Sequence, residues 1–328
     1  MNAFNRMGLV GLALAFMAVT SHAAGIESSV EARGPAGLLK GTMLAPKSGA
    51  SPVVLIIPGS GPTDRDGNSP LGVTASTYRL LAEGLANNGV TTVRIDKRGM
   101  FGSAAATPDP NAVTIPDYVS DVRSWIAALR ERTGMHCVWL LGHSEGGLVA
   151  LATIQVPAGI CGLILISTAG RPMGEVLREQ LKANPANAPL LPQAMQAIDT
   201  LELDHRVDTS RMDPALAPLF APQIQGFLIS AFSYDPSRLL ANVQKPVLIV
   251  QGLRDIQVSE SDARHLATAD PAATLALVPN ANHVLKSVTS DDPSANVATY
   301  ASSGLPIAPG VIEAIVTFMH THAAASAQ

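Results

Sequence analysis

The sequence contains few cysteines, few aromatic residues and little charge. Its 328 residues include two cysteines, 4% aromatic and 15% charged residues. Two cysteines are too few for a disulfide-dense scaffold or a four-cysteine zinc site. Lysine and arginine total 22 against 26 for aspartate and glutamate, and the resulting net charge of −4 gives no basic footprint for nucleic acid. Past residue 24, no stretch reaches the roughly 18 apolar residues of a membrane span, so we expect no stable membrane anchor.

Residues 1–24 read as a signal peptide. Arg6 gives a positive start, and residues 7–19 are uncharged and mostly apolar. Small residues allow cleavage near Ala23 or Ala24, and no cysteine follows that could carry a lipid. We therefore expect a periplasmic or secreted protein, with an uncleaved N-terminal anchor as the alternative.

Short apolar runs alternate with helical patterns along the rest of the chain. The runs are residues 52–57, 90–95, 137–141, 163–166, 247–250 and 275–278, and the helical patterns are residues 77–88, 117–132, 145–155 and 310–322. Nearly unbroken apolar runs are typical of parallel strands that are buried on both faces. The alternation predicts an α/β protein with a mostly parallel central sheet and helices on both faces, and residues 26–45 are expected to add an antiparallel edge.

One long stretch, residues 171–242, interrupts this alternation. It is rich in proline, contains Met173, Met195 and Met212, and has a mostly helical pattern. We interpret it as a helical lid inserted over the carboxyl edge of the sheet, because long connections there are usually functional. Residues 25–170 and 243–328 then form the core.

Cys137 and Cys161 each begin a short apolar run. If those runs are neighbouring parallel strands, both thiols lie at the same edge of the sheet. Export to an oxidising compartment would allow a disulfide there. The alternative is two small buried core residues. Either way, we expect a structural role.

The motif Gly142-x-Ser144-x-Gly146 lies between a strand pattern and a helix pattern. A nucleophile elbow requires small residues two before and two after the serine, because side chains there would clash in the sharp turn. The turn would lift the Ser144 hydroxyl above the sheet, at the positive end of the following helix. Ser144 is therefore the candidate nucleophile.

A serine hydroxyl needs a base, and the base needs an acid that orients it. Asp255 follows the strand pattern at 247–250, and His283 follows the one at 275–278. Ser144, Asp255 and His283 would thus all lie at the carboxyl ends of strands, where open α/β sheets place their sites. Asp262 and Glu260 fall in a helical pattern and are weaker candidates for the acid of the triad. The remaining histidines, His143 included, are expected to be packing or surface residues.

An acyl-transfer site also needs two N–H donors for the oxyanion. We expect these to be the backbone N–H of Glu145, directly after the nucleophile, and that of Ser60, in the glycine-rich loop after the strand at 52–57. Asp64, Arg65 and Asp66 are expected to hold that loop by ion pairs, with Arg98 joining them.

These segments resemble the α/β-hydrolase superfamily, most closely the bacterial serine-hydrolase branch related to serine aminopeptidases and carboxylesterases. The loop PGSGPTDRDGN (residues 58–68) is similar to the oxyanion loop of that branch, and DKRGMFGS (residues 96–103) resembles its D-x-RG-x-G-x-S turn with one extra residue. PVLIVQGLRDIQV and NHVLK resemble the acid and histidine segments. The resemblance covers residues 40–325. It implies the α/β-hydrolase fold and a Ser144–Asp255–His283 triad.

Other kinds of site do not match the sequence. The dinucleotide-binding pattern after residue 58 has Asp64 in place of its last glycine, and no GxxxxGK[ST] phosphate loop occurs. The calcium-loop pattern that starts at Asp64 has Ser69 and Ala75 in place of the required glycine and glutamate. No cysteine–histidine cluster has zinc spacing. We therefore expect neither a cofactor nor a metal.

The sequence thus predicts a serine hydrolase that cleaves small carboxylic esters through an acyl-enzyme on Ser144. An aminopeptidase or other amide hydrolase is the first alternative, acyl transfer is a further one, and a non-catalytic binding protein on the same scaffold is an alternative from another class. An aminopeptidase needs a carboxylate for the substrate amine, for which the lid region offers Glu175, Glu179, Glu202 and Asp204. The natural substrate and the oligomeric state are not readable from the sequence.

Overall fold

The structure is a computed structural model that describes residues 25–47 and 51–322. The predicted signal peptide, residues 1–24, lies outside the described residues. In the described part of the chain, no helix has the length and apolar character that a membrane crossing requires.

Eight strands form one sheet in the order β1-β2-β4-β3-β5-β6-β7-β8. They are β1 (Ile26–Arg33), β2 (Leu38–Ala45), β3 (Val53–Ile57), β4 (Thr91–Ile95), β5 (Val138–His143), β6 (Ile160–Ile166), β7 (Val247–Gly252) and β8 (Thr274–Val278). β1 pairs antiparallel with β2, and β2 pairs antiparallel with β4. The other neighbours pair in parallel, which confirms the predicted mostly parallel sheet with an antiparallel edge.

The central strands are buried on both faces. All five residues of β3 are buried. Because successive side chains of a strand point to opposite faces, Val53, Leu55 and Ile57 enter one hydrophobic core, and Val54 and Ile56 enter the other. This two-sided burial explains why the strands appear in the sequence as unbroken apolar runs rather than as alternating patterns.

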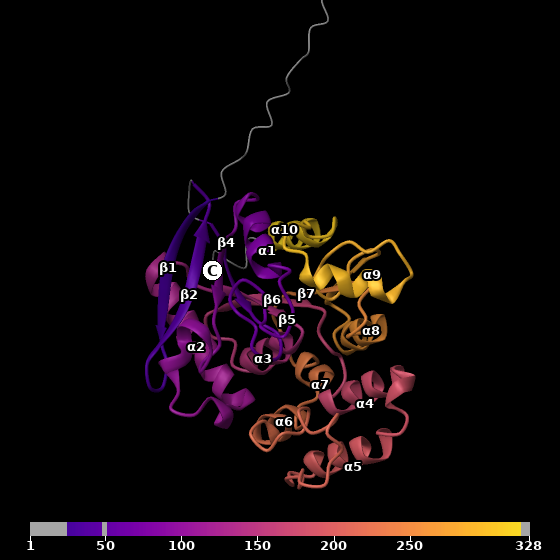
Figure 1. Cartoon of the computed structure of the whole chain (residues 1–328). Helices are drawn as coiled ribbons and strands as arrows, with labels where there is room; N and C mark the ends of the chain where they lie inside the picture. The colour runs from indigo at the N-terminus through magenta and orange to yellow at the C-terminus, as the bar shows by residue number, and fades with distance from the viewer. Residues whose placement is uncertain (1–24, 48–50, 323–328) are drawn as a thin grey trace, which may run out of the picture.

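Helices cover both faces of the sheet (Figure 1). α2 (Ile115–Thr133), α3 (Glu145–Ile154) and α8 (Glu260–Ala269) pack in the first core, and α1 (Thr77–Ala86) and α10 (Val311–Thr321) pack in the second. The short helix α9 (Pro293–Ala298) lies in the connection between β8 and α10. Four 3₁₀ helices complete the described elements: Phe101–Ala106, Pro110–Ala112, Pro185–Asn187 and Thr299–Ala301.

Four α-helices lie between β6 and β7: α4 (Met173–Ala183), α5 (Leu191–Glu202), α6 (Gln225–Phe232) and α7 (Pro236–Leu240). We call residues 171–242 the helical insertion. α4, α5 and α6 share a small hydrophobic core of their own, centred on Ile198, Leu201 and Phe220. In Figure 1 these helices form a lobe beside the body that contains the sheet. Arg171, at the start of the insertion, forms an ion pair with Asp262 of α8.

Cys137 and Cys161 form a disulfide, so the structure has the crosslink rather than two separate buried thiols. Cys137 directly precedes β5, and Cys161 is the second residue of β6. Both are buried. The disulfide therefore joins the amino ends of two neighbouring parallel strands, at the sheet edge opposite to the one where β5 leads into Ser144.

Candidate active site

Ser144 occupies a sharp turn between β5 and α3. Its backbone has φ 55° and ψ −121°, a strained combination for a residue with a side chain. A Cβ atom on Gly142 would lie 2.4 Å from the carbonyl oxygen of Gly146, and one on Gly146 would lie 2.2 Å from that of Ile57. Only glycine fits at these two positions. The turn thus has the geometry of the predicted nucleophile elbow.

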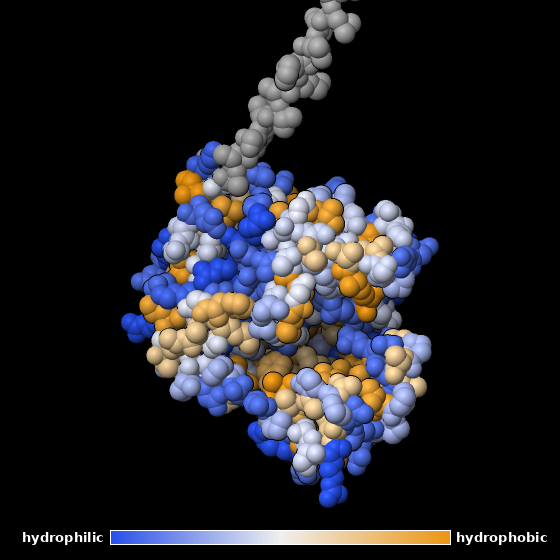
Figure 2. Space-filling model, viewed as in Figure 1, coloured by the Kyte–Doolittle hydropathy of each residue, from blue (hydrophilic) through white to orange (hydrophobic). Residues whose placement is uncertain are grey.

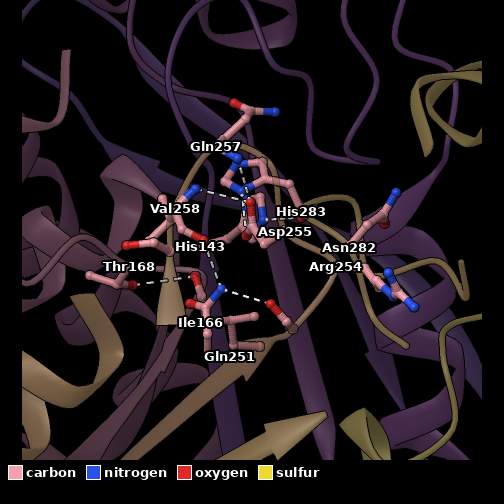
Figure 3. Close-up of polar contacts among 12 residues, drawn as sticks. His143, Ile166, Thr168, Gln251, Arg254, Asp255, Gln257, Val258, Asn282 and His283 are labelled. Carbon is pink, nitrogen blue, oxygen red and sulfur yellow. Dashed lines mark hydrogen bonds and ion pairs between the residues drawn. The ribbon is translucent and has the colours of Figure 1, made fainter. Parts of the chain in front are cut away.

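Asp255 and His283 are in direct contact (Figure 3). The Nδ1 atom of His283 lies 2.8 Å from Oδ2 of Asp255. The other carboxylate oxygen, Oδ1, accepts hydrogen bonds from the backbone N–H groups of Gln257 (2.8 Å) and Val258 (3.0 Å). Burial raises the pKa of Asp255, but His283 and these hydrogen bonds lower it by more, so the pKa lies below its usual range. Asp255 is therefore a fixed carboxylate that orients the imidazole.

The turn that carries Asp255 is itself held in place. Gln251, buried at the end of β7, donates hydrogen bonds from Nε2 to the carbonyl oxygens of Gly252 (3.0 Å) and Val258 (2.9 Å) (Figure 3). The alternative acid Asp262 makes no such contact with His283 and instead binds Arg171 and caps the start of α8.

His143, directly before the nucleophile, is buried and has a partner on each ring nitrogen. Nδ1 lies 2.9 Å from the Tyr78 hydroxyl, and Nε2 lies 2.8 Å from the backbone carbonyl oxygen of His283. The centres of the His143 and His283 rings are 4.8 Å apart. Burial lowers the pKa of His143 to about 3, so the ring is neutral. The sequence predicts His143 as a packing or surface residue, although an imidazole at the end of an otherwise apolar strand is a signal that it has polar partners.

The two expected oxyanion donors lie on either side of the turn. Glu145 is the first residue of α3, and a backbone N–H at this position has no hydrogen-bond acceptor within the helix. Ser60 lies in the loop after β3, and both residues line the same cavity as Ser144. A Cβ atom on Gly59 would lie 3.3 Å from the Cβ atom of Ser144, so this loop lies directly against the elbow.

Sequence reasoning missed Lys97, which is buried next to this turn. Its Nζ atom lies 3.7 Å from the carboxylate of Glu145 and 5.5 Å from the centre of the Tyr118 ring. Burial lowers the pKa of Lys97, and the neighbouring carboxylate of Glu145 opposes that shift. The motif DKRG contained the residue, but nothing in the sequence indicated that this lysine is buried.

The charged loop at residues 64–66 is held partly as expected. Arg65 binds Asp96, and Asp66 binds Arg94. Asp64 instead accepts hydrogen bonds from backbone N–H groups of its own loop. The expectation that Arg98 joins this loop is wrong, because its guanidinium binds Asp117 and Asp121 of α2 instead.

A cavity of about 650 Å³ opens above Ser144, between the sheet and the helical insertion. Figure 2 shows a hollow between the two lobes with hydrophobic residues on its walls. Its apolar lining comes from both lobes: Met100, Val113, Leu148, Met173, Val176, Leu177, Leu219, Ile224, Phe227 and Leu228. The site can therefore hold an uncharged, apolar group next to the serine.

The four acidic residues considered for an amine-binding role do not line this cavity. Glu179 forms an ion pair with Arg171, and Glu202 forms one with Arg178. Glu175 and Asp204 are exposed. The acidic residue that does line the cavity is Glu145, which is paired with Lys97. Among the described residues, no group of three or more histidine, cysteine, aspartate or glutamate side chains could hold a metal ion.

Comparison with known proteins supports the same fold. The chain is 28% identical over 226 residues to the esterase EstD of Thermotoga maritima, which covers 68% of this chain and 52% of EstD. The chain thus spans about half the length of the curated relative it matches. Among solved structures, it is similar in fold to Est1E from Butyrivibrio proteoclasticus (TM-score 0.56, 17% identity, 90% of this chain and 99% of that one).

The Pyrococcus furiosus esterase Pf2001 is also similar in fold (TM-score 0.58, 14% identity, 91% of each chain). The model of the alpha/beta hydrolase family matches residues 53–299, three quarters of the chain. The protein belongs to the alpha/beta hydrolase family.

Proposed function

We propose that the protein is a serine carboxylesterase. The observation that carries the proposal is the 2.8 Å contact between His283 and Asp255 at the sheet edge where Ser144 stands on its strained turn. Acyl transfer uses a serine, a carboxylate and a histidine, and the chain carries these groups in the order Ser144, Asp255, His283. The esterase relative EstD supports the same chemistry.

In the proposed reaction, the Ser144 hydroxyl attacks the ester carbonyl carbon while its proton passes to His283. Asp255 keeps the imidazole in the required tautomer and stabilises the imidazolium. The N–H groups of Ser60 and Glu145 bind the oxyanion. The C–O bond to the alcohol then breaks, and His283 protonates the leaving oxygen. A water molecule, deprotonated by His283, hydrolyses the acyl-enzyme and restores Ser144.

The cavity favours esters with apolar groups over aminoacyl amides. Binding a free amine in this site would require an unpaired carboxylate, and the acidic residue that lines the cavity, Glu145, already faces Lys97. An alkyl or aryl group would instead bury its surface against the apolar side chains of the insertion, which contributes roughly 0.8 kcal/mol per buried CH₂ group.

Initial rates on p-nitrophenyl esters from acetate to laurate, next to aminoacyl p-nitroanilides, test the proposal. We expect ester turnover with a chain-length optimum, and a loss of roughly 10⁴-fold or more in Ser144→Ala. A Ser144→Ala protein with near-wild-type rates would refute the role of Ser144. Anilide turnover without ester preference would favour the aminopeptidase. A folded protein that turns over neither class and does not react with a fluorophosphonate would favour a binding protein.

We also propose that the protein is exported to the periplasm or secreted. The disulfide between Cys137 and Cys161 supports an oxidising compartment, where such bonds form and persist. The N-terminal sequence of the protein recovered from a bacterial host provides the test, with a new terminus near residue 24 as the expected result. An intact protein with Met1 retained in the cytoplasm would contradict the proposal.

A further inference from the structure

Both polar groups of Gly59, the residue before the proposed oxyanion donor Ser60, are held by buried side chains. The backbone N–H of Gly59 donates a 2.9 Å hydrogen bond to the hydroxyl of Tyr78. The carbonyl oxygen of Gly59 accepts a 2.7 Å hydrogen bond from Nζ of Lys97. Tyr78 comes from helix α1, and Lys97 comes from the loop after β4. Two separate segments of the chain thus hold the same residue.

The carbonyl group of Gly59 and the N–H group of Ser60 belong to one peptide unit. A trans peptide is planar, so the two groups point in opposite directions within one plane. All described peptide bonds are trans. The ammonium that binds the carbonyl oxygen therefore also sets the direction of the Ser60 N–H. No hydrogen-bond acceptor is found for this N–H among the described residues, which leaves it free for a ligand.

We propose that Lys97 and Tyr78 are positioning residues that aim the Ser60 N–H at the developing oxyanion. The inference rests on the proposed function and deepens it. Neither side chain needs to touch the reacting atoms, because each acts through the backbone of Gly59.

Lys97 also ties the two oxyanion donors together. Its Nζ atom binds the loop that carries Ser60 and lies 3.7 Å from the carboxylate of Glu145, whose own N–H is the other proposed donor. The side chains of Lys97 and Glu145 are 5% and 3% exposed, so little water screens the pair. A cation on the Gly59 carbonyl polarises that peptide, which makes the Ser60 N–H a stronger donor to an anion.

Tyr78 fixes the preceding peptide in the same way. The hydroxyl accepts from the Gly59 N–H, and its own hydrogen is directed to Nδ1 of His143. Tyr78 is 2% exposed, so no solvent competes for these bonds. With one side chain on each polar group, Gly59 cannot rotate without losing a buried hydrogen bond.

The main test replaces Lys97 with Met, which has a similar shape but neither a charge nor a donor. We expect kcat on the best p-nitrophenyl ester to fall by roughly 10- to 100-fold with KM changed by less than about twofold, because loss of an oxyanion donor acts on the transition state. The kcat of the Tyr78→Phe variant should fall by about 10-fold. Lys97→Arg should recover part of the Lys97→Met loss, because it restores a donor.

A trifluoromethyl ketone with the acyl chain of that ester provides the readout specific to the oxyanion. It adds to a catalytic serine and forms an oxyanion, whereas the matching secondary alcohol cannot. Across the variants, the ketone Ki should weaken in proportion to the loss in kcat/KM, and the alcohol Ki should stay constant. Rates are divided by the fraction of protein that reacts with a fluorophosphonate, so that misfolded protein does not count as slow enzyme.

Two further variants serve as controls. Lys97→Met leaves Glu145 as an unpaired buried carboxylate, so the double variant Lys97→Met/Glu145→Gln removes that charge. It should stay as slow as Lys97→Met, and recovery of the wild-type kcat would overturn the proposal. Arg123→Met removes a cation that binds the carbonyl oxygens of Thr153 and Val156, at the end of α3 remote from Ser144, and should leave kcat unchanged.

Failure of this inference differs from failure of the proposed function. An active wild type whose Lys97→Met variant keeps its kcat within twofold would overturn the positioning role alone. A loss of kcat without a matching change in the ketone Ki would overturn it as well. A wild type that hydrolyses no ester and does not react at Ser144 would overturn the carboxylesterase assignment, and the positioning role with it.

Discussion

The imidazole of His143 donates a 2.8 Å hydrogen bond from Nε2 to the backbone carbonyl oxygen of His283. The carbonyl can only accept, so the hydrogen must be on Nε2, and Nδ1 is left to accept from the Tyr78 hydroxyl. The chain of bonds from Gly59 through Tyr78 and His143 to His283 thus has one consistent set of donors and acceptors. It connects the loop of the proposed oxyanion donor Ser60 to the loop of the proposed base, and it requires a neutral His143.

This requirement predicts that acid destabilises the protein through His143. Burial lowers its pKa from 6.5 to about 3, so between these values the unfolded chain binds a proton that the folded chain does not. Stability therefore rises with pH in this window and falls as the pH is lowered, by about 2 to 3 kcal/mol between pH 7 and pH 4.5. His143→Gln retains a donor and an acceptor but does not titrate. This variant should therefore not show the loss of stability that protonation of His143 causes.

Urea unfolding of the wild type and His143→Gln at pH 7 and pH 4.5 measures the difference. Groups common to both proteins cancel in the comparison. Asp255 and Asp262 have lowered pKa values, so the stability that their carboxylates contribute is also lost in acid. That loss occurs only at pH values near and below the ordinary aspartate pKa of 3.8. Equal losses in both proteins would show that His143 is not the group that responds to acid.

Asp255→Asn should leave the fold intact and lower kcat by roughly 10³- to 10⁴-fold. The carboxylate uses one oxygen for His283 and the other for the N–H groups of Gln257 and Val258. An amide has a single oxygen, so it must either direct its NH₂ group at these N–H donors or favour the wrong imidazole tautomer. Burst kinetics and circular dichroism on the same sample separate lost chemistry from lost fold. A variant with more than a tenth of the wild-type kcat would show that Asp255 does not orient the base.

The parallel strands and the loops that follow them were predictable because their chemistry is local. An apolar run of four to six residues, a glycine-flanked serine and a polar loop each appear in the sequence as short patterns. Parallel strands place their carboxyl ends at one sheet edge, so the loops of Asp255 and His283 could be expected near Ser144 without a structure. The family resemblance added the chain order of the three residues.

The residues that support this site could not be predicted because their surroundings come from distant segments. Tyr78 is one member of the buried stripe of α1, and only the fold places its hydroxyl at Gly59. Lys97 follows a strand, where a lysine usually reaches solvent, but α3 and the loop that carries Gly59 and Ser60 enclose it. The partners of Arg98 could not be predicted for the same reason, since Asp117 and Asp121 lie on the helix that packs over it. Burial of a charged residue depends on which loops close around it.

Removing the disulfide should reduce stability without changing the chemistry. The crosslink between Cys137 and Cys161 spans 24 residues, for which loop entropy in the unfolded chain predicts a contribution of roughly 3 kcal/mol. It lies at the amino ends of β5 and β6, away from Ser144. Urea unfolding of Cys137→Ala/Cys161→Ala should show this loss, with kcat at 25 °C within twofold of the wild type. A folded double variant with a tenfold lower kcat would show that the crosslink positions the elbow.

The size of the cavity should set the chain length of the best ester, through residues of the insertion. Val176 of α4 is 8% exposed and lines the cavity. Val176→Trp should fill the space of about three CH₂ groups of a long acyl or alkyl chain. At about 0.8 kcal/mol each, their exclusion lowers kcat/KM for the longest esters by roughly 50-fold, while acetate, which does not reach that far, keeps its rate.

The matched control is Lys182→Trp, which adds the same side chain to an exposed position of the same helix outside the cavity lining. It should leave the chain-length profile of p-nitrophenyl esters unchanged. Equal losses on acetate and laurate in Val176→Trp would mean that the substitution disturbs Ser144 itself rather than the pocket. An unchanged profile in both variants would mean that the substrate chain leaves the site by another route. The shift in optimum thus tests whether the helical insertion forms the substrate-binding wall.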